Sequence, residues 1–174
     1  MALRIPLAAD PQQTPPASPE PPVFGEFIER VQQYITLQKA LPRLRTTTKR
    51  KEIVERREAL AERIRKTRSK AKRGDIFTPE ISAEFRRLIQ SAFQGPGAPN
   101  VLKTIRKGEP VRAWRPKING DYPEDLPLTT VPPTLLLRLP QLPEEVAYRV
   151  VGRDLVLQDM EARVVIDFIP GALP

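Results

Sequence analysis

The stretch from Glu144 to Ile169 constrains the fold more than any other part of this 174-residue chain. Apolar β-forming residues recur there densely, with turn residues between them. Two short runs, Val146–Val151 and Asp154–Asp159, are separated by Gly152-Arg153. A glycine at the first central position is what a two-residue type II′ hairpin turn requires. A second turn leads into a third run, Arg163–Ile169, so we predict a three-stranded antiparallel meander.

The third run is apolar at three consecutive positions, Val164, Val165 and Ile166. Consecutive side chains of a strand point to opposite faces of the sheet. The run therefore predicts a sheet that is covered on both faces, and the helices expected earlier in the chain are the natural cover.

Three helices are predicted before this segment. The first begins at Pro22 and ends after about 18 residues at Leu41-Pro42, because the residue before a proline is disfavoured in a helix. The second runs to about Arg73, with Gly74 as its stop and Thr46, Thr47 and Thr48 as candidate caps. The third has Thr78 as its cap and Pro79 at its first position, and it ends at Gly95-Pro96.

Three smaller elements are also expected. They are a short helix over Asn100–Lys107, an edge strand over Val111–Ile118 that contains Trp114, and one or two helical turns within Val131–Leu137.

The fold class that follows is α+β, with about three N-terminal helices packed on a small C-terminal antiparallel meander and a Pro-rich irregular connection between them. Residues 1–22 contain seven prolines and are predicted to be a disordered tail. Residues 23–174 are predicted to form one domain, with a helical part over 23–108 and the connection and β part over 109–174.

The absence of cysteine and histidine excludes disulfides, thiol nucleophiles, Cys/His zinc sites and imidazole acid–base chemistry. A candidate pair of catalytic carboxylates is Asp159 with Asp167. Asp159 is more simply a turn residue, and Asp167 is expected to pair with Arg149 or Arg163. There is no P-loop, nucleophile elbow or dinucleotide fingerprint. We therefore predict a non-enzymatic protein without a cofactor or a metal.

Positive charge is concentrated in one segment and predicts the main binding site. Between Leu41 and Gly74 there are 14 Lys and Arg against 4 Glu, a net +10, whereas from Asn119 to Pro174 there are 4 Arg against 9 Asp and Glu, a net −5. The candidate polyanion- or partner-binding residues are Arg63, Arg65, Lys66, Arg68, Lys70, Lys72 and Arg73.

Two interpretations of this segment stay open. It could neutralise the phosphates of nucleic acid or of anionic lipid. It could instead be a solvated helix face that offsets the acidic C-terminal part, within one molecule or across a dimer. The expected partners are therefore an unknown protein, a second copy of the chain, or a nucleic acid or anionic surface bound weakly and non-specifically. No apolar run approaches the length of a transmembrane span, about 18 residues.

Several motifs together resemble those of a known family. These motifs are AKRGDIFTPE, FRRLIQSAFQGP, the PLTTVPPTLL run, LPQLPEEVAYRVVGRDLVLQD and VIDFIPGALP. From about Glu26 onward the chain is similar to a family of uncharacterised bacterial proteins, most of them predicted to be exported. The resemblance brings no known activity, and it implies a periplasmic or secreted location.

A second resemblance covers Leu139–Ile169 alone. The order of LP, an aromatic residue, Gly-x-Asp, an apolar strand, Asp and another apolar strand is similar to the small β module of periplasmic nickel and cobalt homeostasis proteins of the RcnB type. Because the chain lacks the histidines that a nickel site prefers, metal handling is not carried over. The leading prediction is a non-enzymatic exported protein of the bacterial envelope. The alternative is an intracellular basic protein associated with nucleic acid or the ribosome.

Overall fold

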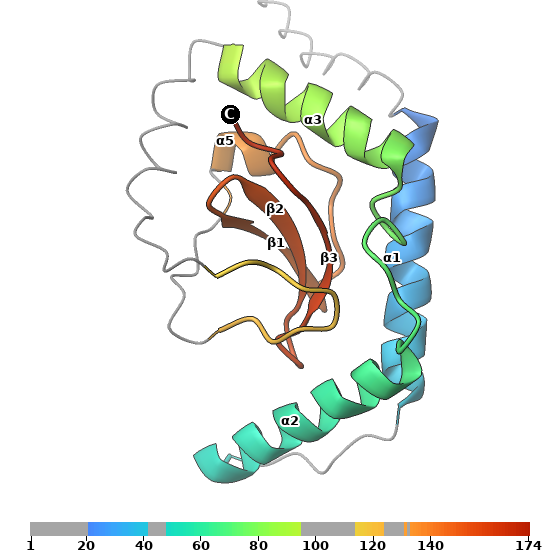
Figure 1. Ribbon diagram of the computed structural model, residues 1–174, viewed down its shortest axis with the longest axis vertical. Coiled ribbons are helices and arrows are strands. Elements are labelled where there is room, and N and C mark those ends of the chain that lie inside the picture. Colours follow the sequence, from blue (N-terminus) through green and yellow to red (C-terminus); the bar gives the residue numbers. More distant parts are fainter. Residues whose placement is uncertain (1–20, 42–47, 95–113, 124–130, 132) are drawn as a thin grey trace, which may run out of the picture.

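The predicted α+β architecture is present in the computed structural model, which describes residues 21–41, 48–94, 114–123, 131 and 133–174. Three long helices precede a three-stranded antiparallel sheet of order β1-β2-β3. Figure 1 shows α1 beside the sheet, α3 across one end of it and α2 leading away from the end of α1. The predicted tail over 1–22 lies outside the described residues, except for Pro21 and Pro22.

Helix α1 spans Pro22–Ala40, and Pro22 lies in its first turn as predicted. Its buried side chains recur at helical spacing, so one stripe faces the core. They are Phe24, Phe27, Val31, Tyr34, Ile35 and Gln38. The helix ends where Leu41 adopts an extended backbone, as expected of a residue before proline.

Helix α2 spans Arg50–Thr67 and is shorter than predicted at its C-terminal end. Its N-cap is Lys49, which makes no capping hydrogen bond, so Thr48 does not have the predicted role; Thr46 and Thr47 lie outside the described residues. Only Leu60, Ala61 and Ile64 of this helix are buried. The N-terminal half of α2 therefore lies on the surface.

Helix α3 spans Pro79–Gln94 and begins as its sequence predicts. The Ile81 N–H donates to Thr78 Oγ1 at 3.3 Å, the bond expected from a threonine N-cap. Phe85 lies at the centre of the aromatic cluster between α1 and the sheet. Its ring centroid is 4.9 Å from that of Phe27 and 5.2 Å from that of Phe77.

The sheet consists of β1 (Val146–Val151), β2 (Asp154–Asp159) and β3 (Val165–Ile169). Val151 pairs with Asp154, so Gly152 and Arg153 form the predicted two-residue turn, and Gly152 has a φ of 58°. The positive φ confirms the predicted role of this glycine. The residues of β3 pair with β2 through a register shift beside Leu157 and Gln158, which leaves Ile166 outside the paired register.

Both faces of the sheet are covered, as the apolar run over Val164–Ile166 predicts. Ile166 packs in the main core with the helices, whereas Val165 packs in a second cluster. That second cluster consists of Tyr122, Val151, Val156 and Val165, with Trp114 and Phe168 against it. The cover on the second face is therefore the segment over residues 114–123, which is not a helix.

The smaller predicted elements have mixed outcomes. Helix α5, Pro133–Leu136, confirms the helical turn that was expected after Val131. Residues 114–118 form no strand, and the nearby ladder contact is a single bridge between Asp121 and Val164. The expected helix over Asn100–Lys107 and the rest of the expected edge strand lie outside the described residues.

Candidate binding surface and adjoining pocket

Helix α2 ends at Thr67 because the side chain of Asn119 binds the backbone at this point. Asn119 Nδ2 donates to the carbonyl oxygen of Arg68 at 2.8 Å, and the Arg68 guanidinium donates to Asn119 Oδ1 at 2.8 Å. The prediction that this helix continues to Arg73 is therefore wrong. Gly74 does not end the helix; it lies in the connection to α3, with a φ of 92°.

Asp167 fixes this connection to the sheet. The carboxylate is fully buried and accepts hydrogen bonds from the backbone N–H groups of Gly74, Ile76 and Phe77 at 2.8–3.2 Å. The expected pairing of Asp167 with Arg149 or Arg163 is wrong. The reason for Arg149 is that the two residues lie on opposite faces of the sheet: Asp167 pairs with Leu157 of the main core, whereas Arg149 pairs with Val156 of the second cluster.

Asp159 has the turn role that was predicted, together with contacts to α1. Its Oδ1 accepts the N–H groups of Glu161 and Ala162 at 2.9 and 2.6 Å. Its Oδ2 accepts from Tyr34 Oη at 2.6 Å and from Gln38 Nε2 at 2.8 Å. Burial raises the pKa of Asp159, whereas these four hydrogen bonds act in the opposite direction. Each of the two candidate carboxylates thus has its own set of structural donors.

Two of the seven predicted binding residues make structural contacts instead. Arg65 forms an ion pair with Asp121 and donates to the carbonyl oxygen of Asn119 at 3.1 Å. Arg68 also donates to the carbonyl oxygen of Ile166 at 3.2 Å, and its guanidinium lies 5.1 Å from the ring centroid of Tyr34. Burial lowers the pKa of Arg68, in agreement with its position between α1 and the sheet.

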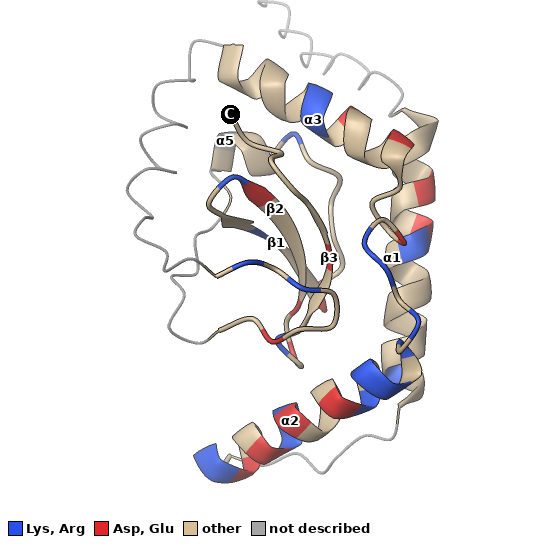
Figure 2. Ribbon diagram, viewed as in Figure 1, with Lys and Arg blue, Asp and Glu red and all other residues tan. Residues whose placement is uncertain are grey.

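The other five predicted cations differ in exposure. Arg63 is half-buried and already has a partner. Four are exposed, and together we call them the basic corner: Lys66, Lys70, Lys72 and Arg73. Figure 2 shows blue at the C-terminal end of α2 and along the connection to α3. Arg73 also has its guanidinium 5.8 Å from the ring centroid of Phe168, so the corner is supported by the sheet below it.

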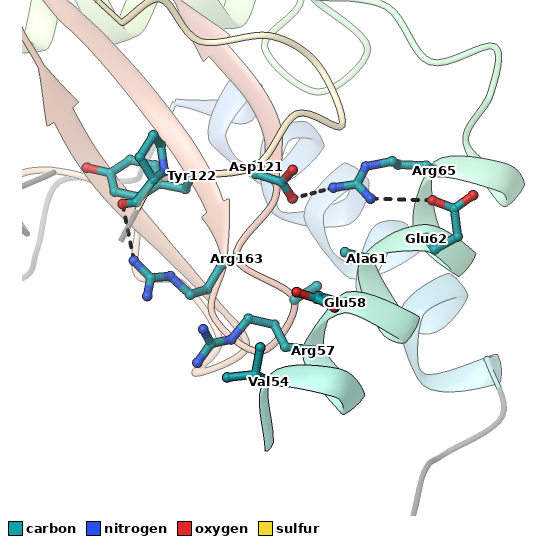
Figure 3. A pocket seen from close by; sticks show the side chains of 11 residues that line it. Val54, Arg57, Glu58, Ala61, Glu62, Arg65, Asp121, Tyr122 and Arg163 are labelled. Atoms are coloured by element: carbon teal, nitrogen blue, oxygen red, sulfur yellow. Dashed lines mark hydrogen bonds and ion pairs between the residues drawn. The ribbon is translucent and has the colours of Figure 1, made fainter. Parts of the chain in front are cut away.

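A pocket of about 640 Å³ adjoins Arg65 (Figure 3). Its walls come from α2, from Asp121–Pro123 and from the turn before β3. Figure 3 shows Arg65 between Asp121 and Glu62, while Arg163 donates to the carbonyl oxygen of Pro123 at 3.2 Å. The lining of the pocket therefore contains both positive and negative side chains. Arg57 also lines the pocket, and it too has an interaction partner.

The sequence prediction missed Asn119 and Asp121, which bind the cations at the end of α2. One signal for this turn is present, because Asn119-Gly120 is a pair typical of tight turns and Asn119 has a φ of 58°. The partner of Arg149 was missed too: it is Gln158, whose Oε1 accepts from Arg149 Nε at 2.8 Å.

Within the described ranges, no group of three or more acidic residues is arranged to hold a metal ion. No helix in those ranges is long and apolar enough to cross a membrane. Comparison of the chain with protein-family models, with curated proteins and with solved structures found no match.

Proposed function

We propose that this chain is a non-enzymatic binding protein that contacts an anionic partner through the basic corner. The observation that supports this most directly is the exposure of Lys66, Lys70, Lys72 and Arg73 together, at the end of α2 and in the connection that follows. None of the four forms an ion pair with a described residue. Their charge is therefore available to a partner, unlike the charges of Arg65 and Arg68.

The geometry of the connection favours a fixed surface over a loose charged loop. The backbone on the C-terminal side of the corner is held by three N–H bonds to Asp167, and the backbone on the N-terminal side is held by Asn119. A cation on such a support loses less conformational freedom when it binds, so more of the electrostatic attraction remains as affinity.

The non-enzymatic part of the proposal is supported by the positions of Asp159 and Asp167. Both are fully buried, and both have their oxygen atoms occupied by protein donors. Acid–base catalysis requires a carboxyl group that can reach a substrate proton. The exported, envelope location of this proposal depends on the sequence resemblance alone, and the intracellular nucleic-acid or ribosome-associated protein is its alternative.

Fluorescence anisotropy with labelled single- and double-stranded oligonucleotides, and with labelled polyglutamate, tests the proposal. Four phosphate contacts give a salt slope of about −3.6 on duplex DNA, which is a loss of about 150-fold in affinity between about 50 and about 200 mM salt. We expect binding of all three probes with this kind of salt dependence. In the quadruple variant Lys66→Gln, Lys70→Gln, Lys72→Gln and Arg73→Gln we expect binding to disappear.

The matched control is a quadruple variant that removes four other exposed cations: Lys51→Gln, Arg87→Gln, Arg115→Gln and Lys117→Gln. It carries the same net charge, so it should retain most of the binding. Equal losses in both variants would contradict a localised surface. A strong preference for either oligonucleotide over polyglutamate would favour the nucleic-acid alternative, and fractionation of cells that express the native reading frame would test the location.

A further inference from the structure

Arg149 lies in an unusual environment on the second face of the sheet. Its side chain is 7% exposed, yet none of the carboxylates that the structure describes is its partner. The guanidinium donates to Gln158 Oε1 at 2.8 Å and to Met160 Sδ at 3.3 Å. A neutral amide and a thioether offset little of the cost of burying a positive charge. Burial accordingly lowers the pKa of Arg149, and the nearby positive charge of Arg163 acts in the same direction.

A buried hydroxyl group lies on the same face of the sheet. Tyr122 is 2% exposed, and within the described residues its hydroxyl has no hydrogen-bond partner. It is close enough to Arg149 and Arg163 for their charges to lower its pKa, against the larger effect of burial. Buried polar groups without a partner are uncommon in native proteins, so among the described residues this face of the sheet is incompletely satisfied; Tyr122 itself lines the pocket beside α2.

A pocket of about 480 Å³ reaches Arg149 along the free edge of β1. Apart from Arg149 its lining is mainly apolar, with side chains from α5, from the chain after α5 and from β1. Members of this lining include Leu136, Leu137, Leu139, Leu142 and Val146. Leu137 is 87% exposed, so the mouth of the pocket is apolar as well. A volume of this size lies within the usual range for small-molecule sites.

We propose that this pocket binds a small amphiphilic carboxylate, with its apolar chain against Leu136, Leu137 and Leu139 and its carboxylate on Arg149. Charge complementarity selects this occupant, since a neutral apolar molecule offers the buried guanidinium no negative charge and a cation is repelled by it. A carboxylate accepts two parallel hydrogen bonds from one guanidinium. The site is separate from the basic corner, and its test is independent of the proposed function.

Isothermal titration calorimetry tests the proposal with decanoate and decyltrimethylammonium below their micellar concentrations and with decanol below its solubility limit. We expect decanoate to bind saturably, with an affinity at least about tenfold higher than either of the others, because only decanoate supplies the charge-assisted pair. In Arg149→Met we expect the affinity for decanoate to fall at least about tenfold and the affinity for decanol to change little. Because Arg149→Met leaves the buried Oε1 of Gln158 without its donor, we expect a modest loss of stability in the free protein, which a thermal melt without ligand measures.

A second variant keeps the test valid if Arg149→Met fails to fold. Leu137→Asp changes an exposed side chain at the pocket mouth and should weaken decanoate binding without lowering Tm. Ile53→Asp, an exposed position on α2 outside the pocket, is its matched control and should bind as the native protein does. Decanoate binding that is absent, equal to decanol binding, or unchanged in both pocket variants would overturn the proposal. So would a clear preference for an apolar peptide with a free C-terminal carboxylate.

Discussion

Replacing Asp167 by asparagine should destabilise this protein more than the same replacement at Asp159. The two carboxylates are alike in burial, and each has four different donor groups within hydrogen-bond distance. They differ in the kind of donor. At Asp167 all four are backbone N–H groups, from Gly74, Ile76, Phe77 and Phe168. A backbone N–H group can only donate a hydrogen bond, whereas a hydroxyl group or a side-chain amide can also accept one.

The magnitude follows from counting the donors that an asparagine cannot satisfy. If its single oxygen takes the Oδ2 position, it can accept from Ile76, Phe77 and, at 3.2 Å, Gly74, while its NH₂ group faces the N–H group of Phe168. One hydrogen bond to a charged acceptor is lost, at about 1.5–3 kcal/mol, and the bond from Gly74 is kept only at its longer distance, so Asp167→Asn should cost roughly 2–4 kcal/mol. That is a large part of the roughly 5–15 kcal/mol by which domains are stable.

At Asp159 an asparagine can adapt. Its oxygen can accept the N–H groups of Glu161 and Ala162, while its NH₂ group faces Tyr34 and Gln38. The tyrosine hydroxyl can rotate to accept, and the glutamine amide can flip to present its oxygen. We therefore expect Asp159→Asn to cost only about 1 kcal/mol. Urea unfolding followed by circular dichroism at one pH measures both variants. Equal costs for the two variants would refute this account of the donors.

Three further predictions concern the same elements. Gly152→Val should destabilise by more than about 1 kcal/mol because of its φ of 58° alone, since nothing lies within 4 Å of the added Cβ; an unchanged Tm would contradict the turn. Gly25→Ala, at an exposed and unhindered position inside α1, should instead stabilise by about 0.5–1 kcal/mol in the same thermal melt, and a loss would show that the helix is not regular there. The pKa of Asp159 is raised on folding, so this carboxyl group binds a proton more tightly in the folded state than in the unfolded state. The protonated carboxyl group therefore stabilises the folded state fully below about pH 4, and this stabilisation is lost as the pH rises through the pKa of the folded state. The free energy of unfolding of the native protein minus that of Asp159→Asn should therefore decrease as the pH rises from about 4 through the folded pKa, as measured by parallel urea titrations. An increase would show that the hydrogen bonds to Asp159 affect its pKa more than burial does.

The sequence was sufficient where local chemistry determines the structure. The turn at Gly152 and the N-cap at Thr78 each depend on residues within three positions of each other, and both are confirmed. The covered second face was predicted from adjacent apolar residues, Val165 and Ile166. The element that covers this face was not predicted, because apolar periodicity shows that a face is buried but not which element buries it.

The failures come from contacts between distant parts of the chain. Arg68 and Asn119 are 51 residues apart, and Asp167 and Gly74 are 93 residues apart. The helical charge pattern at the end of α2 is compatible with a longer helix, whereas the structure ends the helix at Thr67, where Asn119 binds the carbonyl oxygen of Arg68. For the same reason the sequence could not show which of the seven cations remain exposed.

The contact of α1 with Asp159 has a consequence for the biosynthesis of the protein. Tyr34 and Asp159 are 125 residues apart, so at roughly 5–20 residues per second the ribosome adds the carboxylate about 6–25 s after the tyrosine. During that interval the apolar stripe of α1 has no sheet to pack against. The stripe is then a surface to which chaperones that bind apolar segments can attach. Refolding of the complete chain should also be slow for its size, because its sheet and first helix are joined by contacts of high sequence separation.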